Sequence, residues 1–301
     1  MATEHVPGAL SVATGVWVGV GSRDEPAELS GVSHFLEHLL FKGTPTRTSQ
    51  EISRSVDRVG GDFNAFTAKE YTAYYCRLPA RHAVFGVDLL GDVLIRPALR
   101  ETDVDSERLV ILEELAMDDD SPDDVAHRMF GAQLFAGHPL GRETAGDRET
   151  VQAITAADVR RFFESHYHAG SMVVTLAGPI DHDEAVQLIS NAFAEVRASG
   201  HRPTRNAPEA IGVHDSIDDD TEQVHIVMAV VLSPAVMTIV KHSMWSTTCS
   251  AAVCRAVCSK RSASVEVWHI RCTPASRPTP TAARSRCTRA RSPSTATRSS
   301  G

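Results

Sequence analysis

The residues with the clearest chemical potential lie in the segment HFLEHLLFKGT, positions 34 to 44. His34 and His38 are four residues apart, and Glu37 directly precedes the second histidine. On an α-helix, positions i and i+4 lie one above the other, so both imidazoles can reach a single metal ion. Neutral imidazoles suit zinc, and a catalytic zinc keeps one position open for water. The spacing therefore predicts a helical zinc site in which Glu37 lies close enough to act on that water.

The neighbouring residues predict that this helix is buried, because its other positions are apolar: Leu36, Leu39, Leu40 and Phe41. Unpaired buried polar groups cost about 1–3 kcal/mol each, and a bound metal would give both histidines and the glutamate a partner. The alternative is a helix whose two histidines are solvated or satisfied within the core. Ser30 or Ser33 is expected to cap the start of the helix.

A catalytic zinc site needs a third protein ligand, often a carboxylate. Candidates lie in the acidic segment ERLVILEELAMDDD, positions 107 to 120, whose apolar stripe predicts a second helix. Glu107 and Glu114 are seven residues apart, two helical turns, and so share one face, whereas Glu113 is rotated by about 100° from Glu114. A solvated helix face is the alternative for any one of these glutamates.

Together these motifs resemble the N-terminal half of pitrilysin-type (insulinase, inverzincin) zinc metallopeptidases and are similar to the mitochondrial processing peptidase branch. Three further segments carry the resemblance: GGDFNAFTAKEYTAYY (60–75), HPLGRETAG (138–146) and MVVTLAGPIDHDE (172–184). The resemblance implies that Glu114, 76 residues after His38, is the third zinc ligand. It also implies that Glu107 orients a ligand, a role that tunes metal affinity.

The resemblance further implies where substrate binds. In that family the strand carrying the N-A-F/Y-T motif is an exposed sheet edge beside the zinc, and a peptide substrate adds to it as an extra strand. The matching positions here are Asn64, Ala65 and Phe66. From the residues alone, this stretch predicts a plain β-hairpin with core aromatics.

The expected fold class is α+β, an antiparallel sheet with packed helices that forms half of a metallopeptidase clamshell, followed by a disordered tail. Residues 1–150 are expected to form the zinc peptidase domain, and 151–232 the start of a second, inactive-type α+β domain that is cut short. Strands are predicted at 10–20, at 62–68 and 71–78 (paired as a hairpin), at 172–178 and at 223–231. Helices are predicted at 48–58, 81–95, 102–118, 122–135, 155–165 and 183–194.

The composition changes abruptly after Leu232. Residues 233–301 contain no leucine, no aspartate and 22 serines or threonines, and they carry a formal charge of +10 against −18 for residues 1–232. Such a segment cannot bury enough apolar surface to fold unaided. A basic nucleic-acid tail, a cysteine metal site and a translation artefact are the three interpretations. The five cysteines in this tail lack paired C-x2-C spacing, which disfavours the metal site.

Back-translation favours the artefact. With GC-rich codons, residues 249–272 read from the third base give LGGGMSSRLFEEIRERRGLAYSV, which resembles the glycine-rich and R-G-L-A-Y segments of the family's second half. We therefore expect a change of reading frame near residue 233, so that the tail is a frameshifted product.

Overall properties exclude several other classes. The formal net charge of −8 and the pI near 5.9 disfavour a nucleic-acid-binding protein. The sequence contains no run of 18 apolar residues, so no membrane span is predicted. The first residues show no secretory signal, and a cytoplasmic protein is therefore expected.

The predicted function is that of a zinc-dependent metalloendopeptidase that hydrolyses extended peptides or unfolded proteins, with one Zn²⁺ per chain and Glu37 as general base. The chain is expected to be incomplete, because the resemblance places further arginine and tyrosine groups near the substrate in the missing half. The alternative is a non-catalytic zinc-binding fragment, or one subunit of a two-chain peptidase whose second chain supplies that half.

Overall fold

The computed structural model describes residues 1–201, 203–209, 215–219 and 224–232, and three further strands at 252–256, 264–272 and 287–288. The chain divides into two compact units. The first consists of residues 1–116 and 142–205, and the second of residues 117–141 and 206–301. All the residues predicted to form the zinc and substrate sites belong to the first unit.

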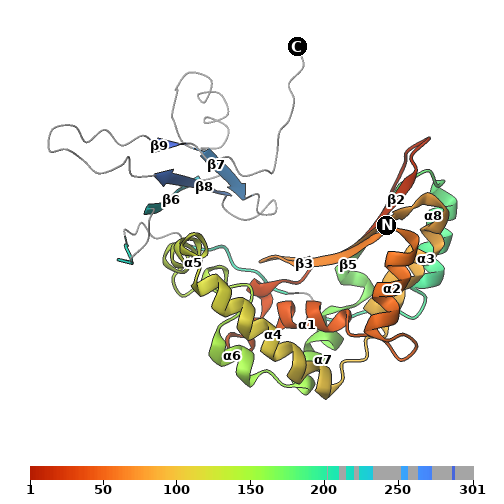
Figure 1. Cartoon of the computed structure of the whole chain (residues 1–301), viewed down its shortest axis with the longest axis horizontal. Coiled ribbons are helices and arrows are strands. Elements are labelled where there is room, and N and C mark those ends of the chain that lie inside the picture. The colour runs from red at the N-terminus through yellow and green to blue at the C-terminus, as the bar shows by residue number, and fades with distance from the viewer. Residues whose placement is uncertain are drawn as a thin grey trace, which may run out of the picture. The chain divides into compact units, whose positions relative to one another are not determined.

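A five-stranded sheet forms the centre of the first unit (Figure 1). Its strands are β1 (Ala2–His5), β2 (Ser11–Val18), β3 (Asp62–Thr67), β4 (Thr72–Pro79) and β5 (Met172–Gly178). Their order across the sheet is β1-β5-β2-β4-β3. The β1–β5 pair is parallel and the other pairs are antiparallel. Strand β3, which carries the predicted substrate residues, is therefore at an edge.

The alternation of residue types along β2 gives the sheet one buried and one open face. Val12, Val16 and Val18 are buried, whereas Ala13 and Trp17, which point to the opposite side, are exposed. This period of two is the pattern of a strand that packs on a core with one side only.

Helices supply the core that covers the buried face. They are α1 (Val32–Leu40), α2 (Ser49–Val59), α3 (Ala83–Ile95), α4 (Glu101–Asp119), α6 (Arg148–Ala153), α7 (Ala156–His166) and α8 (His182–Ala192), whereas α5 (Pro122–Leu134) belongs to the second unit. Helix α3 packs on β2 and β4, and α8 packs on α3 and β1 (Figure 1). Helix α1 contacts β3 and α7, which places the predicted zinc helix next to the edge strand.

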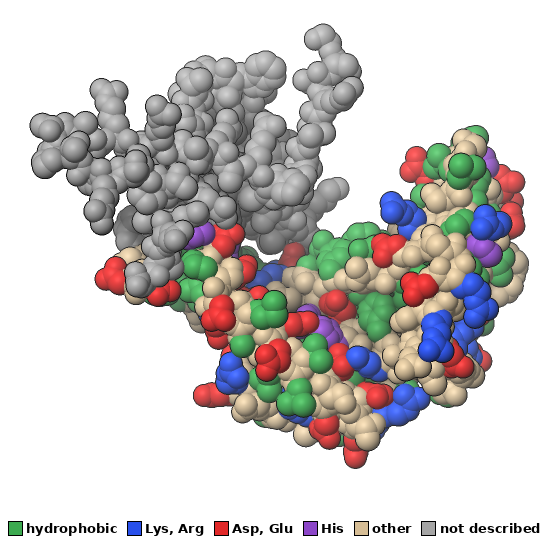
Figure 2. All heavy atoms as spheres, in the orientation of Figure 1, with side chains coloured by type: hydrophobic (Ala, Val, Ile, Leu, Met, Phe, Trp, Pro, Cys, Tyr) green, Lys and Arg blue, Asp and Glu red, His purple; other side chains and the backbone are tan. Residues whose placement is uncertain are grey.

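The other face of the sheet exposes large hydrophobic side chains, which gather there in the space-filling view (Figure 2). Trp17, Phe66, Tyr71 and Val173 are each 39–49% exposed. The rings of Trp17, Phe66 and Tyr71 contact one another with centroid separations of 5.7–6.1 Å. An exposed aromatic cluster of this kind indicates a binding surface.

The predicted α+β class is confirmed, and the predicted helices and strands of the first unit occur within two or three residues of their expected ends. Two features differ from the expectations. Strand β1 and the short helix α6 are not predicted. Strand β5 lies between β1 and β2 in the same sheet. As a result, residues 142–205 pack in one unit with residues 1–116.

The second unit contains α5 and a smaller sheet. Strand β6 (Val224–Leu232) pairs antiparallel with β8 (Ser264–Cys272), which also pairs with β7 (Ala252–Ala256) and β9 (Cys287–Thr288). Strands β7, β8 and β9 lie within residues 233–301, where disorder is expected, so the structure differs from that expectation there. The rest of these residues lies outside the described residues, and the expected frame change falls on the same segment. Among the helices that are described, none has the length and apolar character needed to cross a membrane.

Candidate metal centre

Helix α1 presents two different faces. Phe35, Leu36, Leu39 and Leu40 are at most 1% exposed and anchor the helix in the core. His34, Glu37 and His38 lie on the remaining side, at the i, i+3 and i+4 spacing that aligns side chains along one stripe. The sequence therefore fixes the direction of the three polar groups by burying the rest of the helix.

The structure brings three of the predicted residues together: His34, His38 and Glu114. Glu114 Oε2 lies 3.9 Å from His34 Nε2 and 3.6 Å from His38 Nε2, and the two imidazole centroids are 4.7 Å apart. Within the described part of the chain, no other group of three such side chains meets the spacing of a metal site. Glu113, the neighbour of Glu114, is exposed and takes no part.

This arrangement fits zinc. A tetrahedral ion with bonds of about 2 Å needs donor atoms roughly 3.3–3.5 Å apart, close to the separations found here. Burial lowers the pKa of His34 to about 4, and electrostatic repulsion from the neighbouring His38 makes a smaller contribution in the same direction. The His34 imidazole is thus held in its neutral form, which is the form that binds a metal.

Glu107 supports this group from one side. It is 4% exposed, and its Oε2 lies 3.1 Å from Nδ1 of His38. Its other oxygen forms an ion pair with Lys42, which follows α1. A carboxylate on Nδ1 fixes the tautomer and direction of an imidazole, so that Nε2 of His38 is left to face Glu114.

Glu37 lies between the two histidines and the edge strand. The hydroxyl of Thr67, the last residue of β3, donates a hydrogen bond to the Glu37 carboxylate. Burial raises the pKa of Glu37, and the hydrogen bond from Thr67 partly opposes that effect. A raised pKa makes a carboxylate a stronger base, which suits it to accept and return a proton.

The three predicted substrate residues are on β3, directly before Thr67. Pairing with β4 alternates their directions. Ala65 shares the face of Tyr74, which is buried, whereas Asn64 and Phe66 share the open face. Phe66 is 39% exposed and contacts Trp17 and Tyr71 edge-on, so it does not belong to the core as the hairpin interpretation expected.

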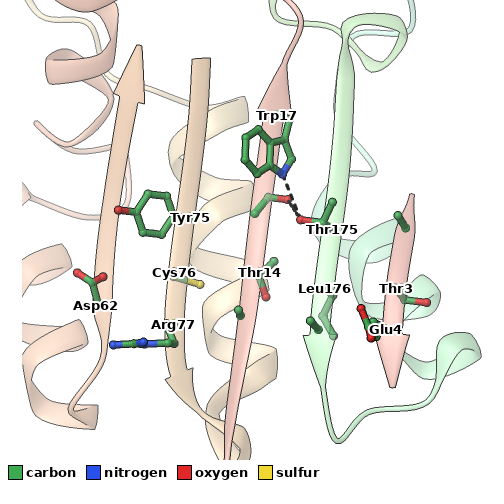
Figure 3. Close-up of a pocket in the computed structure, with 14 residues that line it drawn as sticks. Thr3, Glu4, Thr14, Trp17, Asp62, Tyr75, Cys76, Arg77, Thr175 and Leu176 are labelled. Atoms are coloured by element: carbon green, nitrogen blue, oxygen red, sulfur yellow. Dashed lines mark hydrogen bonds between the residues drawn. The ribbon is translucent and has the colours of Figure 1, made fainter. Parts of the chain in front are cut away.

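A groove of about 520 Å³ crosses the open face of the sheet (Figure 3). Small residues, among them Ala13 and Gly15, form its floor, and the rings of Trp17 and Tyr75 border it. Nε1 of Trp17 donates a hydrogen bond of 3.3 Å to the Thr175 hydroxyl, which steadies the indole (Figure 3). The residues that line the groove do not include His34, His38 or Glu114, so it is separate from the candidate metal centre.

Two residues near the centre are not identified by the sequence analysis. Thr67 is within a quoted motif, but nothing in the sequence shows that it meets Glu37. Glu25 is also missed. It is 4% exposed and accepts hydrogen bonds from the backbone N–H groups of Gly31 and Ser33, at the start of α1. The expectation that Ser30 or Ser33 caps α1 is wrong, because the residue at the cap is Gly31 and no side chain of the cap forms a hydrogen bond.

Comparison with known families gives two adjoining matches. Residues 1–148 match the insulinase family, peptidase family M16, and residues 153–244 match the peptidase M16 inactive domain. An uncharacterized zinc protease of Mycobacterium leprae is 44% identical over 233 residues, which are 76% of this chain and 52% of that protein. The uncharacterized zinc protease YmxG of Bacillus subtilis is 36% identical over 223 residues, 74% of this chain and 54% of that protein.

Solved structures show the same fold. A protease from Helicobacter pylori superposes with a TM-score of 0.74 at 19% identity, over 89% of this chain and 71% of that one. Pitrilysin gives a TM-score of 0.71 at 18% identity, over 89% of this chain and 32% of that one. The chain spans about half the length of the curated relatives it matches. The matches in sequence and fold confirm the resemblance, and the chain belongs to the M16 family of insulinase- and pitrilysin-type peptidases.

Proposed function

We propose that this chain is the zinc-binding part of a metalloendopeptidase that cleaves extended peptides. The observation that carries the proposal is the convergence of His34, His38 and Glu114 beside Glu37, next to an open sheet edge. The names of its relatives as zinc proteases support the choice of metal and reaction. One zinc ion per chain matches the single group of three ligands in the described residues.

In this proposal the residues of the centre divide into zinc ligands, a residue that orients one ligand, and a general base. His34, His38 and Glu114 hold the zinc, and Glu107 keeps His38 in the orientation that binding requires. The zinc would activate a water molecule and polarise the scissile carbonyl. Glu37 takes a proton from the attacking water and delivers it to the leaving amine, and the Thr67 hydroxyl holds the Glu37 carboxylate in place.

The substrate lies along β3. Because β3 is an edge strand, its outer backbone groups have no partner strand in the described sheet. An extended peptide that pairs with residues 64–66 gains main-chain hydrogen bonds and brings its own backbone towards the metal side of the strand. The exposed ring of Phe66 contacts substrate side chains on the open face.

The test is Glu37→Gln, which keeps the size of the side chain but removes its basicity. Loss of a general base lowers turnover by about 10²–10⁴-fold, while the zinc ligands are untouched. Peptide cleavage and zinc content are measured on the parent chain and the variant. Glu113→Gln, an exposed change on α4, is the matched control and should retain parental activity.

The same experiment distinguishes the active peptidase from the second candidate function, which is a non-catalytic zinc-binding half or a subunit that needs a second chain. The observation that favours it is the coverage of about half of the relatives' length. A parent chain that binds zinc and cleaves no peptide supports this second function. Parental cleavage by Glu37→Gln would show that Glu37 is not the base.

A further inference from the structure

Helix α1 begins without a capping side chain of its own. Its N-cap is Gly31, whose φ of +94° is in the left-handed region, and no side chain at the cap forms a hydrogen bond. The first N–H groups of a helix have no partner within the helix and must find one elsewhere. At this helix they bind Glu25. Gly31 N donates to one carboxylate oxygen at 2.8 Å, and Ser33 N donates to the other at 2.7 Å.

The backbone of residues 145–146 packs against the start of α1 from another direction. A side chain on Gly31 would place its Cβ 2.5 Å from the carbonyl oxygen of Ala145, and a side chain on Gly146 would place its Cβ 2.4 Å from that of Ser30. Gly146 also has a positive φ, of +81°. The backbones at 30–31 and 145–146 therefore touch directly, which leaves the helix start no room to shift in that direction.

Glu25 also belongs to a segment that is bonded to the turn after β3. Ser22 N donates to the Ala68 carbonyl at 3.2 Å, and Arg23 N donates to that of Lys69 at 2.9 Å. A Cβ on Gly21 would lie 2.2 Å from the oxygen of Ala68, so the contact is as close as the backbone allows. Residues 21–25 thus link the turn that follows Thr67 to the first turn of α1.

Hydrogen bonds and a neighbouring charge offset the burial of Glu25 only in part. Burial raises the pKa of Glu25 to about 7, and the hydrogen bonds from Ser33 and Gly31 and the charge of Arg142 oppose that rise. Lys69 is partly buried, and its ammonium group donates a hydrogen bond to the carbonyl of Arg142. The two backbone N–H donors therefore hold the Glu25 carboxyl in place, with a smaller contribution from the charge of Arg142.

We propose that Glu25 is a positioning residue for the metal centre, which holds α1 at the axial position where its histidines meet Glu114. Helix α1 has nine residues, and His34 is the third of them, one position after the Ser33 N–H that Glu25 binds. A change at the helix start therefore acts directly on His34 and, one turn later, on Glu37 and His38. The inference rests on the proposed function, because the positioned groups are the proposed ligands and base.

The test is Glu25→Gln in the full chain. A glutamine offers only one acceptor oxygen for two N–H donors, and its NH₂ group faces the second N–H. We expect zinc affinity, measured by competition with a chromogenic chelator, to fall by about tenfold or more, as it does when partners of metal ligands are changed. The visible absorption of the Co²⁺-loaded chain should also change in shape, because the ligand geometry alters.

The control is the same substitution at another helix cap. Glu51 accepts hydrogen bonds from N and Oγ1 of Thr48 at the start of α2, which carries none of the proposed ligands. Glu51→Gln should keep the parental zinc affinity and Co²⁺ spectrum. Circular dichroism confirms that each variant is folded at the temperature of titration. If Glu25→Gln does not fold, Glu25→Asp replaces it. Aspartate keeps the carboxyl group but is one methylene shorter.

The outcomes are distinct. Parental zinc affinity and an unchanged Co²⁺ spectrum in the folded Glu25 variant would overturn this inference alone. A parent chain that binds no zinc at all would overturn the proposed function, and this inference with it. Equal losses in the Glu25 and Glu51 variants would show a general effect on stability and not a positioning role.

Discussion

The two glutamates of α4 show how position on one helix separates two roles at the proposed metal centre. Glu114 faces the Nε2 atoms of both histidines and its side chain is 43% exposed, whereas Glu107 is enclosed and contacts Nδ1 of His38. The seven-residue spacing puts both on one face, and two turns along that face bring them to opposite sides of the same imidazole. A water or substrate can approach the first but not the second.

Glu107→Gln is therefore expected to weaken zinc binding without removing a ligand. The amide cannot carry the charge that supports both the His38 tautomer and Lys42, and zinc affinity should fall by about 10–100-fold. A chelator competition titration measures the change. Glu113→Gln, on the same helix but exposed, is the control. An unchanged affinity in the Glu107 variant would show that His38 is oriented by its own helix alone.

At the level of residues, the sequence predicts most of the centre because its signal is a spacing. Two histidines one turn apart must share a face, and the approach of Glu114 follows from the resemblance. Glu25 escapes prediction for a physical reason. Caps are sought within one or two residues of the helix start, but this carboxylate reaches Gly31 and Ser33 from six and eight residues earlier, across a turn. Only a folded chain shows such a contact.

The connection between α1 and α2 is held by a buried carboxylate on a third helix. Asp92 of α3 is 2% exposed and accepts hydrogen bonds from the Thr44 hydroxyl at 2.9 Å and from Arg47 at 2.6 Å. Burial alone would raise the pKa of Asp92, but the hydrogen bond from Thr44 and the charge of Arg47 outweigh burial, so the pKa is lowered. The segment that follows α1 is thereby fixed to the core.

This lowered pKa predicts how the stability depends on pH. In the unfolded chain, Asp92 titrates near its ordinary value of about 3.9. Its contribution to the free energy of unfolding is therefore fully present above that value and is lost as the pH falls through the lower, folded-state pKa. Asp92→Asn should destabilise the chain by about 1–3 kcal/mol at pH 7, and the gap to the parent should narrow at pH 3.

Urea unfolding at both pH values measures this effect. Asp88→Asn is the matched control, because Asp88 also pairs with Arg47 but its side chain is 56% exposed, and exposed pairs contribute little. If the gap between Asp92→Asn and the parent is the same at pH 3 and pH 7, the charge of Asp92 does not carry the stabilisation.

The edge strand makes a separate prediction about substrate binding. Phe66 exposes 39% of its surface on the open face, beside Trp17 and Tyr71, so a bound peptide can cover its ring. Phe66→Ala should raise KM about tenfold, which corresponds to about 1.4 kcal/mol of lost apolar contact, with a smaller effect on kcat. Steady-state cleavage of a peptide series measures both constants. A fall in kcat at constant KM would instead place Phe66 in support of the metal centre.

At the level of elements, local sequence patterns predict the helices and the β3–β4 hairpin. They do not predict which strands far apart in the sequence pair with one another. Strand β1 has four residues, largely exposed, and so lacks the alternation that marks β2. It is stabilised by its parallel pairing with β5, about 170 residues later in the chain. The same pairing draws residues 142–205 into the first unit, an arrangement that no local pattern encodes.

At the scale of the whole molecule, composition and family matches change at nearly the same place. The match to the M16 inactive domain ends at residue 244, and the leucine-free, basic segment begins at residue 233. The segment lacks the leucines that commonly build the core of an α+β domain and carries a formal charge of +10. The change in composition supports our proposal that residues 233–301 arise from a shifted reading frame, whereas the family match continues over the first twelve of these residues.

Sequencing the coding DNA across codons 225–275 tests this proposal. We expect one inserted or deleted base whose correction restores L-G-G-G-M-S-S-R-L-F in place of the cysteine-rich stretch that begins at Cys249. The corrected chain should cleave peptides faster than the present one, because the resemblance places arginine and tyrosine groups near the substrate in the second half, while zinc affinity should stay the same. Confirmation of the present frame would remove the artefact as an explanation. Activity should then depend on a second chain, and mixing experiments with candidate partner subunits would measure that dependence.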